Sequence, residues 1–548
     1  MELSDEPPAK RPRCLESPSS SAVSLNIEAL KAFVKEMLQN SVEPLIDHAL
    51  PRVLKGSIRF REGFITGVAP VIGPVTARRR DGFTSVIDIG LEMDLGAHIV
   101  ISMARLSVPI GVNRIEFRGK LSVALREKSS PPFIAGLEIY FAEPPRLIFG
   151  FAGVAKCAEC PGIRGIIRSA ITKALCKSMV LPTRIPVDLC RGDDIDAIDL
   201  KHPDPLGAIV LTLRSATGLI GVNLALGPRT SDPYVTVQVG QKLWQSPTIK
   251  RNVNPVWTNA NVATFLVHDE TQLVRFSVYD EETVHSNDLI GETGGVWLKC
   301  LASSGQTTDT SLPLMYQGRS GAGGSLQVSA SWLTTADRLP ERYEVPHDEA
   351  CHIVIIAKLL RLSGLGPEVA PCQVRLSIGT ICTDVSNLSR PVLRNEAATA
   401  ELEGVCRRLA QRGESVEAIS ALTCLSIAAV NAVIAARDGG EKRRQMSRLA
   451  VAQIKGLVEF KSVLQLIQPW ARDLEEETLL LELLDKHGCQ IASPVRVPMA
   501  SLVHGQPCHL DGPFEFLPGI SLEASLRLLW LYPEHRNEDE EEFFDCLD

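Results

Sequence analysis

Two long stretches of strict apolar–polar alternation constrain this chain more than any other feature of its sequence. In FTSVIDIGLEMDL an apolar side chain stands at every second position, and Asp88, Glu92 and Asp94 stand on the other side of the alternation. RIEFRGKLSVAL repeats the pattern, with charged residues between its apolar ones. A period of two is that of a β-strand with one buried face, because successive side chains point to opposite faces. The sequence therefore predicts long, half-buried antiparallel strands between about 55 and 155, including strands at 133–142 and 146–152.

Helical patterns flank these strands on both sides. Apolar residues between Ile27 and Leu45 recur at three- and four-residue steps, and a second amphipathic helix is predicted at about 163–180. A sheet with two helices has two interpretations. It could pack around a solid core, or it could be curved and leave its apolar face open for lipid, and periodicity alone does not separate the two.

The segment after these strands resembles a known lipid-binding module. PRLIFGFAGVAKCAECPGIRGIIRSAITKALCKSMVLPTRIPVDL is similar to the closing segment of an SMP domain, the synaptotagmin-like mitochondrial lipid-binding module, and VEPLIDHALP is similar to its opening. The resemblance covers about 28–195 and implies a TULIP-like half-barrel that carries glycerolipid acyl chains and usually forms an end-to-end homodimer. We assign this domain to 23–200. Its candidate groove residues are Ile87, Ile89, Leu91, Met93, Ile115, Phe117, Leu121, Val123, Phe149 and Phe151.

Residues 206–335 read as short strands separated by turn signals, which is typical of a β-sandwich. The motifs SDPY at 231–234 and NPVW at 254–257, in this order, resemble those of the C2 domain. An SMP domain followed by C2 is the arrangement of the extended synaptotagmins, the tricalbins and the plant synaptotagmins. The overall expectation is a multidomain, mainly β protein with some α-helix.

A second, degenerate C2 domain is predicted at 347–532, with a helical insert at about 396–456 and with VRVPMASLV (495–503) among its later strands. Within the insert, GESVEAISALTCLSIAAVNAVIAAR has the pattern of a helix-turn-helix. DNA binding requires a basic surface. The formal charge is −8, and seven acidic residues lie in 538–548, so the rest of the chain is nearly neutral. We therefore interpret the insert as a helical hairpin in a sandwich loop and expect no nucleic-acid partner.

The C2 resemblance implies a calcium site in the loops of the first C2 domain (206–335). Calcium takes about six to eight oxygen ligands and prefers carboxylates. The acidic residues at family ligand positions are Asp232, Asp280, Glu282 and Asp288. An aspartate is expected about six residues before Asp232, but Leu226 stands there, and Asn223 is a candidate neutral substitute. The alternative is that these acids only solvate their loops.

The second C2 domain (347–532) lacks this set of acids. The chain reads Ala370-Pro371-Cys372 where SDPY is expected, and Asp485 stands alone in the DKHG loop. We expect no calcium there, so its role would be packing, partner binding or calcium-independent lipid contact.

The C-terminus ends in the acidic tract EDEEEFFDCLD. Its last seven residues resemble the FFAT motif, with Cys546 where alanine is usual and Asp548 where glutamate is usual. The resemblance implies binding to the MSP domain of the VAMP-associated proteins of the endoplasmic reticulum, whereas the alternative is a solubilising acidic tail. The candidate receptor-binding residues are Glu542, Phe543, Phe544, Asp545, Cys546 and Asp548.

The remaining signals bear on location and chemistry. No window has the roughly 18 apolar residues of a membrane span, and residues 1–22 are polar and expected to be disordered. The 14 cysteines are expected to be reduced in the cytosol. Neither GxSxG nor HExxH occurs, so we expect no enzyme. The prediction is a cytosolic, peripheral lipid-transport and tethering protein of endoplasmic reticulum contact sites. The alternative is a calcium- and phospholipid-responsive trafficking scaffold that moves no lipid.

Overall fold

The computed structural model divides the chain into two compact units, Met1–Ile134 with Glu138–Ile185, and Ala135–Leu137 with Pro186–Asp548. We describe each unit separately. The described residues are 58–67, 71–103, 106–131, 133–152, 163–190, 197–221, 230–282, 287–302, 307–338, 352–364, 371–386, 389–393, 396–423, 425, 427–435, 453–469, 476–504 and 509–533. The predicted helix at 27–45 and the acidic tail lie outside them.

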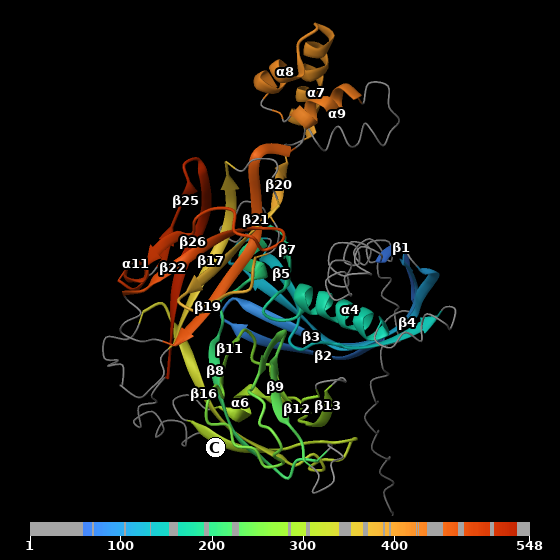
Figure 1. Cartoon of the computed structure of the whole chain (residues 1–548), viewed down its shortest axis with the longest axis vertical. Coiled ribbons are helices and arrows are strands. Elements are labelled where there is room, and N and C mark those ends of the chain that lie inside the picture. Colours follow the sequence, from blue (N-terminus) through green and yellow to red (C-terminus); the bar gives the residue numbers. More distant parts are fainter. Residues whose placement is uncertain are drawn as a thin grey trace, which may run out of the picture. The chain divides into compact units, whose positions relative to one another are not determined.

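The first unit contains most of one sheet and the helix α4, Ile163–Met179 (Figure 1), while Ala135–Leu137 and Pro186–Asp188 of that sheet fall in the second unit. The sheet order is β1-β3-β4-β5-β7, with β2 paired to β3 and β6 paired to β4. The two alternating segments form β3 and β4, a long hairpin. The predicted strands at 133–142 and 146–152 correspond to β5 and β6, and α4 corresponds to the predicted helix at 163–180. The strand bounds are β1 Ile58–Gly67, β2 Val71–Asp81, β3 Thr84–Met103, β4 Leu106–Glu127, β5 Ile134–Phe141, β6 Arg146–Ala152 and β7 Ile185–Asp188.

One end of this sheet is more buried than alternation predicts. Asp88, on the face expected to be polar, is only 2% exposed. Its carboxylate accepts a hydrogen bond from Ser122 at 2.6 Å and pairs with Arg78 and Lys120. Burial raises the pKa of Asp88, whereas its hydrogen bonds and the neighbouring cations lower it. The second effect is larger, so the pKa of Asp88 is lowered. The face of β3 that carries Asp88 is therefore covered near this residue.

The first C2 domain is a sandwich of two antiparallel sheets. One has the order β10-β9-β12-β13 with β14 on β12, and the other contains β11-β8-β16 with β15 on β16. Apolar residues at alternate positions of both sheets meet in one buried core, for example Val237, Phe276 and Leu326. The bounds are α5 Ala197–Lys201, β8 Gly207–Thr217, β9 Pro233–Val239, β10 Lys242–Gln245, β11 Val262–Val267, β12 Leu273–Asp280, β13 Asp288–Glu292, β14 Val296–Trp297, α6 Leu298–Leu301, β15 Thr308–Pro313 and β16 Ser325–Ala336.

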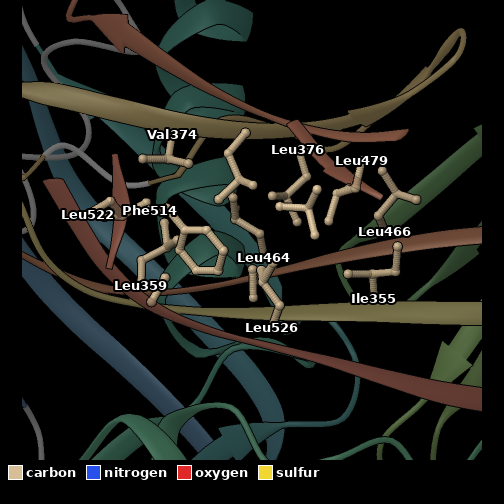
Figure 2. Packing of buried hydrophobic residues seen from close by; sticks show 14 of the residues in the cluster. Ile355, Leu359, Val374, Leu376, Leu464, Leu466, Leu479, Phe514, Leu522 and Leu526 are labelled. Atoms are coloured by element: carbon tan, nitrogen blue, oxygen red, sulfur yellow. The ribbon is translucent and has the colours of Figure 1, made fainter. Parts of the chain in front are cut away.

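The second C2 domain is also a sandwich, with β26-β17-β21-β20 facing β19-β18-β22-β23. Figure 2 shows its core, where Ile355, Leu376, Leu479 and Leu526 pack together from both sheets. The bounds are β17 His352–Ser363, β18 Cys372–Ile378, β19 Ile381–Cys382, β20 Arg390–Leu393, β21 Gln453–Pro469, β22 Thr478–Asp485, β23 Val495–Pro498, α11 Met499–Val503, β24 His509–Asp511, β25 Phe514–Leu517 and β26 Ile520–Tyr532.

Part of one predicted strand in this domain is wrong. VRVPMASLV forms β23 only up to Pro498, and Met499–Val503 is the short helix α11. The segment after Pro498 has no alternation, and Met499 and Leu502, three residues apart, are its buried side chains. That spacing fits a helical turn rather than a strand.

Strand pairing joins the two sandwiches. The last residues of β16 pair with the last residues of β26, from Thr334↔Tyr532 to Ala336↔Trp530. Beside this junction, Arg527 pairs with Asp337 at 3.0 Å. The junction unites one sheet of each sandwich in a ten-stranded sheet, so the two C2 domains share a continuous backbone hydrogen-bond network.

The helical insert follows β20 and precedes β21. Its described helices are α7 Glu396–Gln411, α8 Val416–Thr423 and α9 Ile427–Ala435. They pack around a core of their own, which comprises Cys406, Ile419, Leu425, Ala429, Val430 and Val433. The insert is thus a small helical module rather than a long loop. Of the helices in the described part of the chain, none has the length and hydropathy to cross a bilayer.

Candidate functional site

Three of the four predicted acidic calcium ligands lie at the ends of neighbouring strands. Asp232 immediately precedes β9, Asp280 is the last residue of β12, and Asp288 is the first residue of β13. In the register, Asp280 faces Pro233 on one side and Asp288 on the other. Glu282 follows two residues after β12. The sheet therefore gathers carboxylates from two loops at one end of the sandwich.

Asp280 is the buried centre of this group, with no exposed surface. Its Oδ1 accepts a hydrogen bond from the Asp232 backbone N–H at 2.5 Å. Burial raises the pKa of Asp280, this hydrogen bond opposes the rise, and the negative charges of Glu282, Asp232 and Asp288 add to it. Asp280 thus lies among other carboxylates, and this concentration of negative charge favours a cation.

A lysine that the sequence reasoning missed lies against these acids. Lys250 Nζ is 3.3 Å from Asp232 Oδ2 and 2.5 Å from Glu281 Oε2. The two carboxylates raise the pKa of Lys250 and keep it charged. Lys250 is 18 residues from Asp232 in sequence, so only the folded sandwich brings the two together. The ammonium supplies part of the positive charge that the acids attract.

Asn287 is a second residue that the sequence reasoning missed. Its Oδ1 accepts a hydrogen bond from the Glu282 N–H at 2.9 Å, and its Nδ2 donates to the Tyr234 hydroxyl at 2.8 Å. Tyr234 belongs to the SDPY motif, so this amide links the loop after β12 to β9, the strand that follows Asp232. The sequence SND at 286–288, which runs into β13, is visible in the sequence but does not by itself indicate that Asn287 holds this loop.

The donor set suits Ca²⁺ because it consists of carboxylate oxygens with excess negative charge. Within the described residues, however, no three His, Cys, Asp or Glu side chains form a cluster that could hold a metal ion. Asn223 and Leu226 fall in 222–229, and 283–286 also lie outside the described part of the chain. The residues fit the ion chemically, and calcium binding by them remains a prediction.

The corresponding end of the second C2 domain is organised differently. In the register Cys372 faces Asp485, just as Pro233 faces Asp280, so Pro371 occupies the position of Asp232. Asp485 Oδ1 accepts hydrogen bonds from the Cys489 and His487 N–H groups, both at 2.8 Å. These bonds lower the pKa of Asp485. Its charge is satisfied within its own loop.

The predicted groove residues share one face of the N-terminal sheet. Cross-strand register pairs Ile87 with Val123, Ile89 with Leu121, Met93 with Phe117, and Ile115 with Phe149. Most of these side chains are half-buried, while Phe117 and Phe149 are buried. The side chain of Phe151 lies outside the described set.

The helix α4 contributes to this face. Leu175, Cys176 and Met179 pack on the same cluster as Phe117, with Leu91, Met93 and Leu121. Phe117 and Phe141 contact each other at 5.6 Å between ring centroids. The face is apolar and incompletely covered by the described residues, which is compatible with a lipid groove.

Comparison with known proteins bears on the whole arrangement. A family model described as "C2 domain" matches residues 207–310. Human extended synaptotagmin-3 is 28% identical over 249 residues, which cover 44% of this chain and 28% of that protein. Extended synaptotagmin-2-A of Xenopus laevis is 26% identical over 272 residues, covering 47% of this chain and 30% of that protein. The chain is homologous to the extended synaptotagmins.

The chain also shares the fold of the extended synaptotagmins. A solved structure of extended synaptotagmin 2, comprising its SMP domain and its first two C2 domains, matches 92% of this chain over 96% of its own length. The TM-score is 0.57 and the sequence identity is 17%. The chain therefore has the SMP–C2–C2 architecture. The matched regions span less than a third of the human and Xenopus relatives.

Proposed function

We propose that the chain carries glycerophospholipid in its SMP domain and tethers membranes at contact sites of the endoplasmic reticulum. The observation that carries the proposal is the row of half-buried apolar pairs across β3 and β4, such as Ile89 and Leu121, in a chain with the SMP–C2–C2 fold. Covering an acyl chain with apolar surface is favourable by about 0.8 kcal/mol per CH₂. A face of this length would therefore hold a lipid chain out of water.

The first C2 domain would dock on an anionic membrane. Asp232, Asp280, Glu282 and Asp288 would hold calcium, with Asn223 as a neutral ligand. Bound calcium supplies the positive charge that lets an acidic loop approach lipid phosphates. The Asp232 N–H holds the Asp280 carboxylate in place, and Lys250 would give up its contact with Asp232 as the ion enters.

The acidic tail would hold the other membrane. Phe543 and Phe544 would anchor in the MSP domain of a VAMP-associated protein, and the surrounding acids would steer the tail to a basic surface. This part of the proposal rests on the FFAT-like sequence. The SMP resemblance further suggests a homodimer. The protein would then be peripheral on the endoplasmic reticulum and contact a second membrane through its first C2 domain.

Fluorescent-lipid transfer between two vesicle populations tests this function. One population carries the MSP receptor and the other carries phosphatidylserine, and the full chain is added with and without calcium. Transfer is expected to fall when Phe543→Ala/Phe544→Ala removes the tail anchors or when Asp280→Asn/Asp288→Asn removes ligand charge.

Variants that fill the groove distinguish a lipid carrier from a scaffold that moves no lipid. Ile89→Trp/Leu121→Trp places two indoles on the apolar face and should stop transfer while vesicle clustering persists. Arg118→Trp, an exposed position on β4 with the opposite alternation, is the matched control and should transfer normally. Clustering by the unaltered chain without any lipid transfer would refute the carrier and favour the scaffold.

A further inference from the structure

Two phenylalanines of the SMP domain are exposed where most large apolar side chains would be buried. Phe83 lies in the turn between β2 and β3 and is 66% exposed. Phe133 ends the turn between β4 and β5 and is 60% exposed. Neither ring belongs to the apolar face described above.

Backbone hydrogen bonds bring the two turns to the same end of β4. The Glu127 N–H donates to the Phe83 carbonyl at 2.8 Å, and the next N–H, that of Lys128, donates to the Phe133 carbonyl at 2.9 Å. Each turn is also closed internally. The Phe83 N–H donates to Asp81 Oδ1 at 2.8 Å, and the Phe133 N–H donates to the Ser130 carbonyl at 2.9 Å. The two aromatic residues thus sit on fixed backbones.

Phe133 adopts a φ of 66°, in the left-handed region. A bulky residue is uncommon there and is held at an energetic cost, whereas glycine would fit without one. The turn by itself therefore does not require phenylalanine at position 133.

The strands that lead into these turns, β2 and β4, carry arginines that meet at one buried acid. The buried carboxylate of Glu138 contacts Arg80 at 3.1 Å, Arg126 at 2.9 Å and Arg184. These cations outweigh burial and lower the pKa of Glu138. The charged side chains at this end include Arg79, Arg80, Arg126, Lys128, Arg184, Asp81, Glu127, Glu138 and Asp188, with a net charge of +1.

We propose that Phe83 and Phe133 form a membrane-docking tip of the SMP domain, which inserts two rings into the interface of an anionic bilayer. Phenylalanine is among the apolar residues that interfacial segments bury at the boundary between headgroups and acyl chains, and the net positive charge of this end complements an anionic surface. A stable protein interface would bury roughly 800 Å² per partner around such anchors, whereas this tip offers two rings between polar turns. The docking is independent of the calcium site.

Vesicle sedimentation of the full chain tests the tip. Binding to vesicles of phosphatidylcholine with phosphatidylserine is measured in a calcium chelator, so that calcium-dependent docking does not contribute. Phe83→Ala/Phe133→Ala should weaken binding about tenfold or more, since two buried rings are lost. Phe83→Trp/Phe133→Trp should bind at least as well as the unaltered chain, and vesicles without phosphatidylserine should bind more weakly.

The matched control is Val71→Ala/Ile72→Ala, two exposed apolar residues of β2 in the same unit. It should change vesicle binding less than about twofold. The proposal is wrong if the unaltered chain does not bind anionic vesicles in chelator, or if the control loses as much binding as the phenylalanine variant. It is also wrong if the phenylalanine variant keeps its vesicle binding but changes oligomeric state, because the tip would then contact a second copy. Lipid transfer could survive any of these outcomes.

Discussion

The two C2 domains have an aspartate at equivalent positions of their sandwiches, but the surroundings of the two carboxylates differ in charge. Asp280 ends β12 and Asp485 ends β22, each facing the strand that begins at the SDPY position. Asp280 is buried among other acids and its pKa is raised. Asp485 is capped by backbone N–H groups of its own loop and its pKa is lowered. The negative charge around Asp280 favours a bound cation, whereas backbone N–H groups already stabilise the charge of Asp485.

This difference separates the roles of the two domains. The first keeps carboxylates on two loops and has a lysine, Lys250, as a weak internal counter-ion. In the second domain, Pro371 stands at the position equivalent to Asp232. This domain has a large apolar core and contains the helical insert. Because β16 and β26 pair, the second domain can support the first without binding an ion itself.

The largest expected effect is on calcium affinity. Asp280→Asn/Asp288→Asn should weaken calcium binding by the full chain roughly 100-fold, because two ligand charges are removed. Asp485→Asn is the matched control and should leave the affinity unchanged. Isothermal titration calorimetry measures both. Equal losses in the two variants would break the distinction between the domains.

A smaller effect is expected on the melting temperature measured in a calcium chelator. Replacing the aspartate by asparagine should shift it in opposite directions in the two domains. A raised folded-state pKa means that ionised Asp280 destabilises the fold above that pKa, and the cost disappears as pH falls below the unfolded-state pKa. Asp280→Asn should therefore raise the melting temperature at pH 7 by about 2–4 °C, and the gain should shrink in acid.

Asp485 has the opposite linkage. Its lowered pKa adds stability that is present above the unfolded-state value and is lost as pH falls through the folded value. Asp485→Asn should lower the melting temperature at pH 7, and this loss should shrink in acid. Scanning calorimetry from pH 7 down to about pH 3 compares the two variants across the ordinary aspartate range. Shifts of the same sign would contradict the electrostatic account.

The smallest expected effect concerns Lys250. The lysine is exposed, so solvent screens its ion pairs with Asp232 and Glu281 and each contributes little to stability. Lys250→Met should raise calcium affinity about two- to fivefold by removing a competing cation. Lys242→Met changes an equally exposed lysine, which faces Val239 in the register at the other end of β9, and it should have no effect. A lower affinity in Lys250→Met would mean that the lysine helps to shape the site.

The sequence predicted the regular parts of the fold well because they have strong periodicity. The alternation around Ile89 and Leu121 identified β3 and β4, and the SDPY motif located β9. The sequence also indicated Asp280 as a candidate calcium ligand and Asp485 as a lone acid in the DKHG loop. Short segments without alternation were harder, and Met499–Val503 is a helix where a strand was predicted.

Contacts between distant segments could not be predicted in this way. Lys250 reaches Asp232 only because the sandwich folds β9 beside the loop before NPVW. Glu138 gathers its three arginines from β2, β4 and the segment after α4, and no spacing in the sequence signals this cluster. Burial of Asp88 likewise depends on Arg78 from a neighbouring strand, which alternation along β3 does not reveal.

Native mass spectrometry of the full chain tests the central proposal, lipid carriage, most directly. The protein is purified, exchanged into a volatile buffer and sprayed intact, and the bound lipids are released and identified. The account predicts glycerophospholipid bound to the unaltered chain and to Arg118→Trp, and its loss from Ile89→Trp/Leu121→Trp. An unaltered chain that carries no lipid, and takes up none after incubation with phospholipid vesicles, would contradict it.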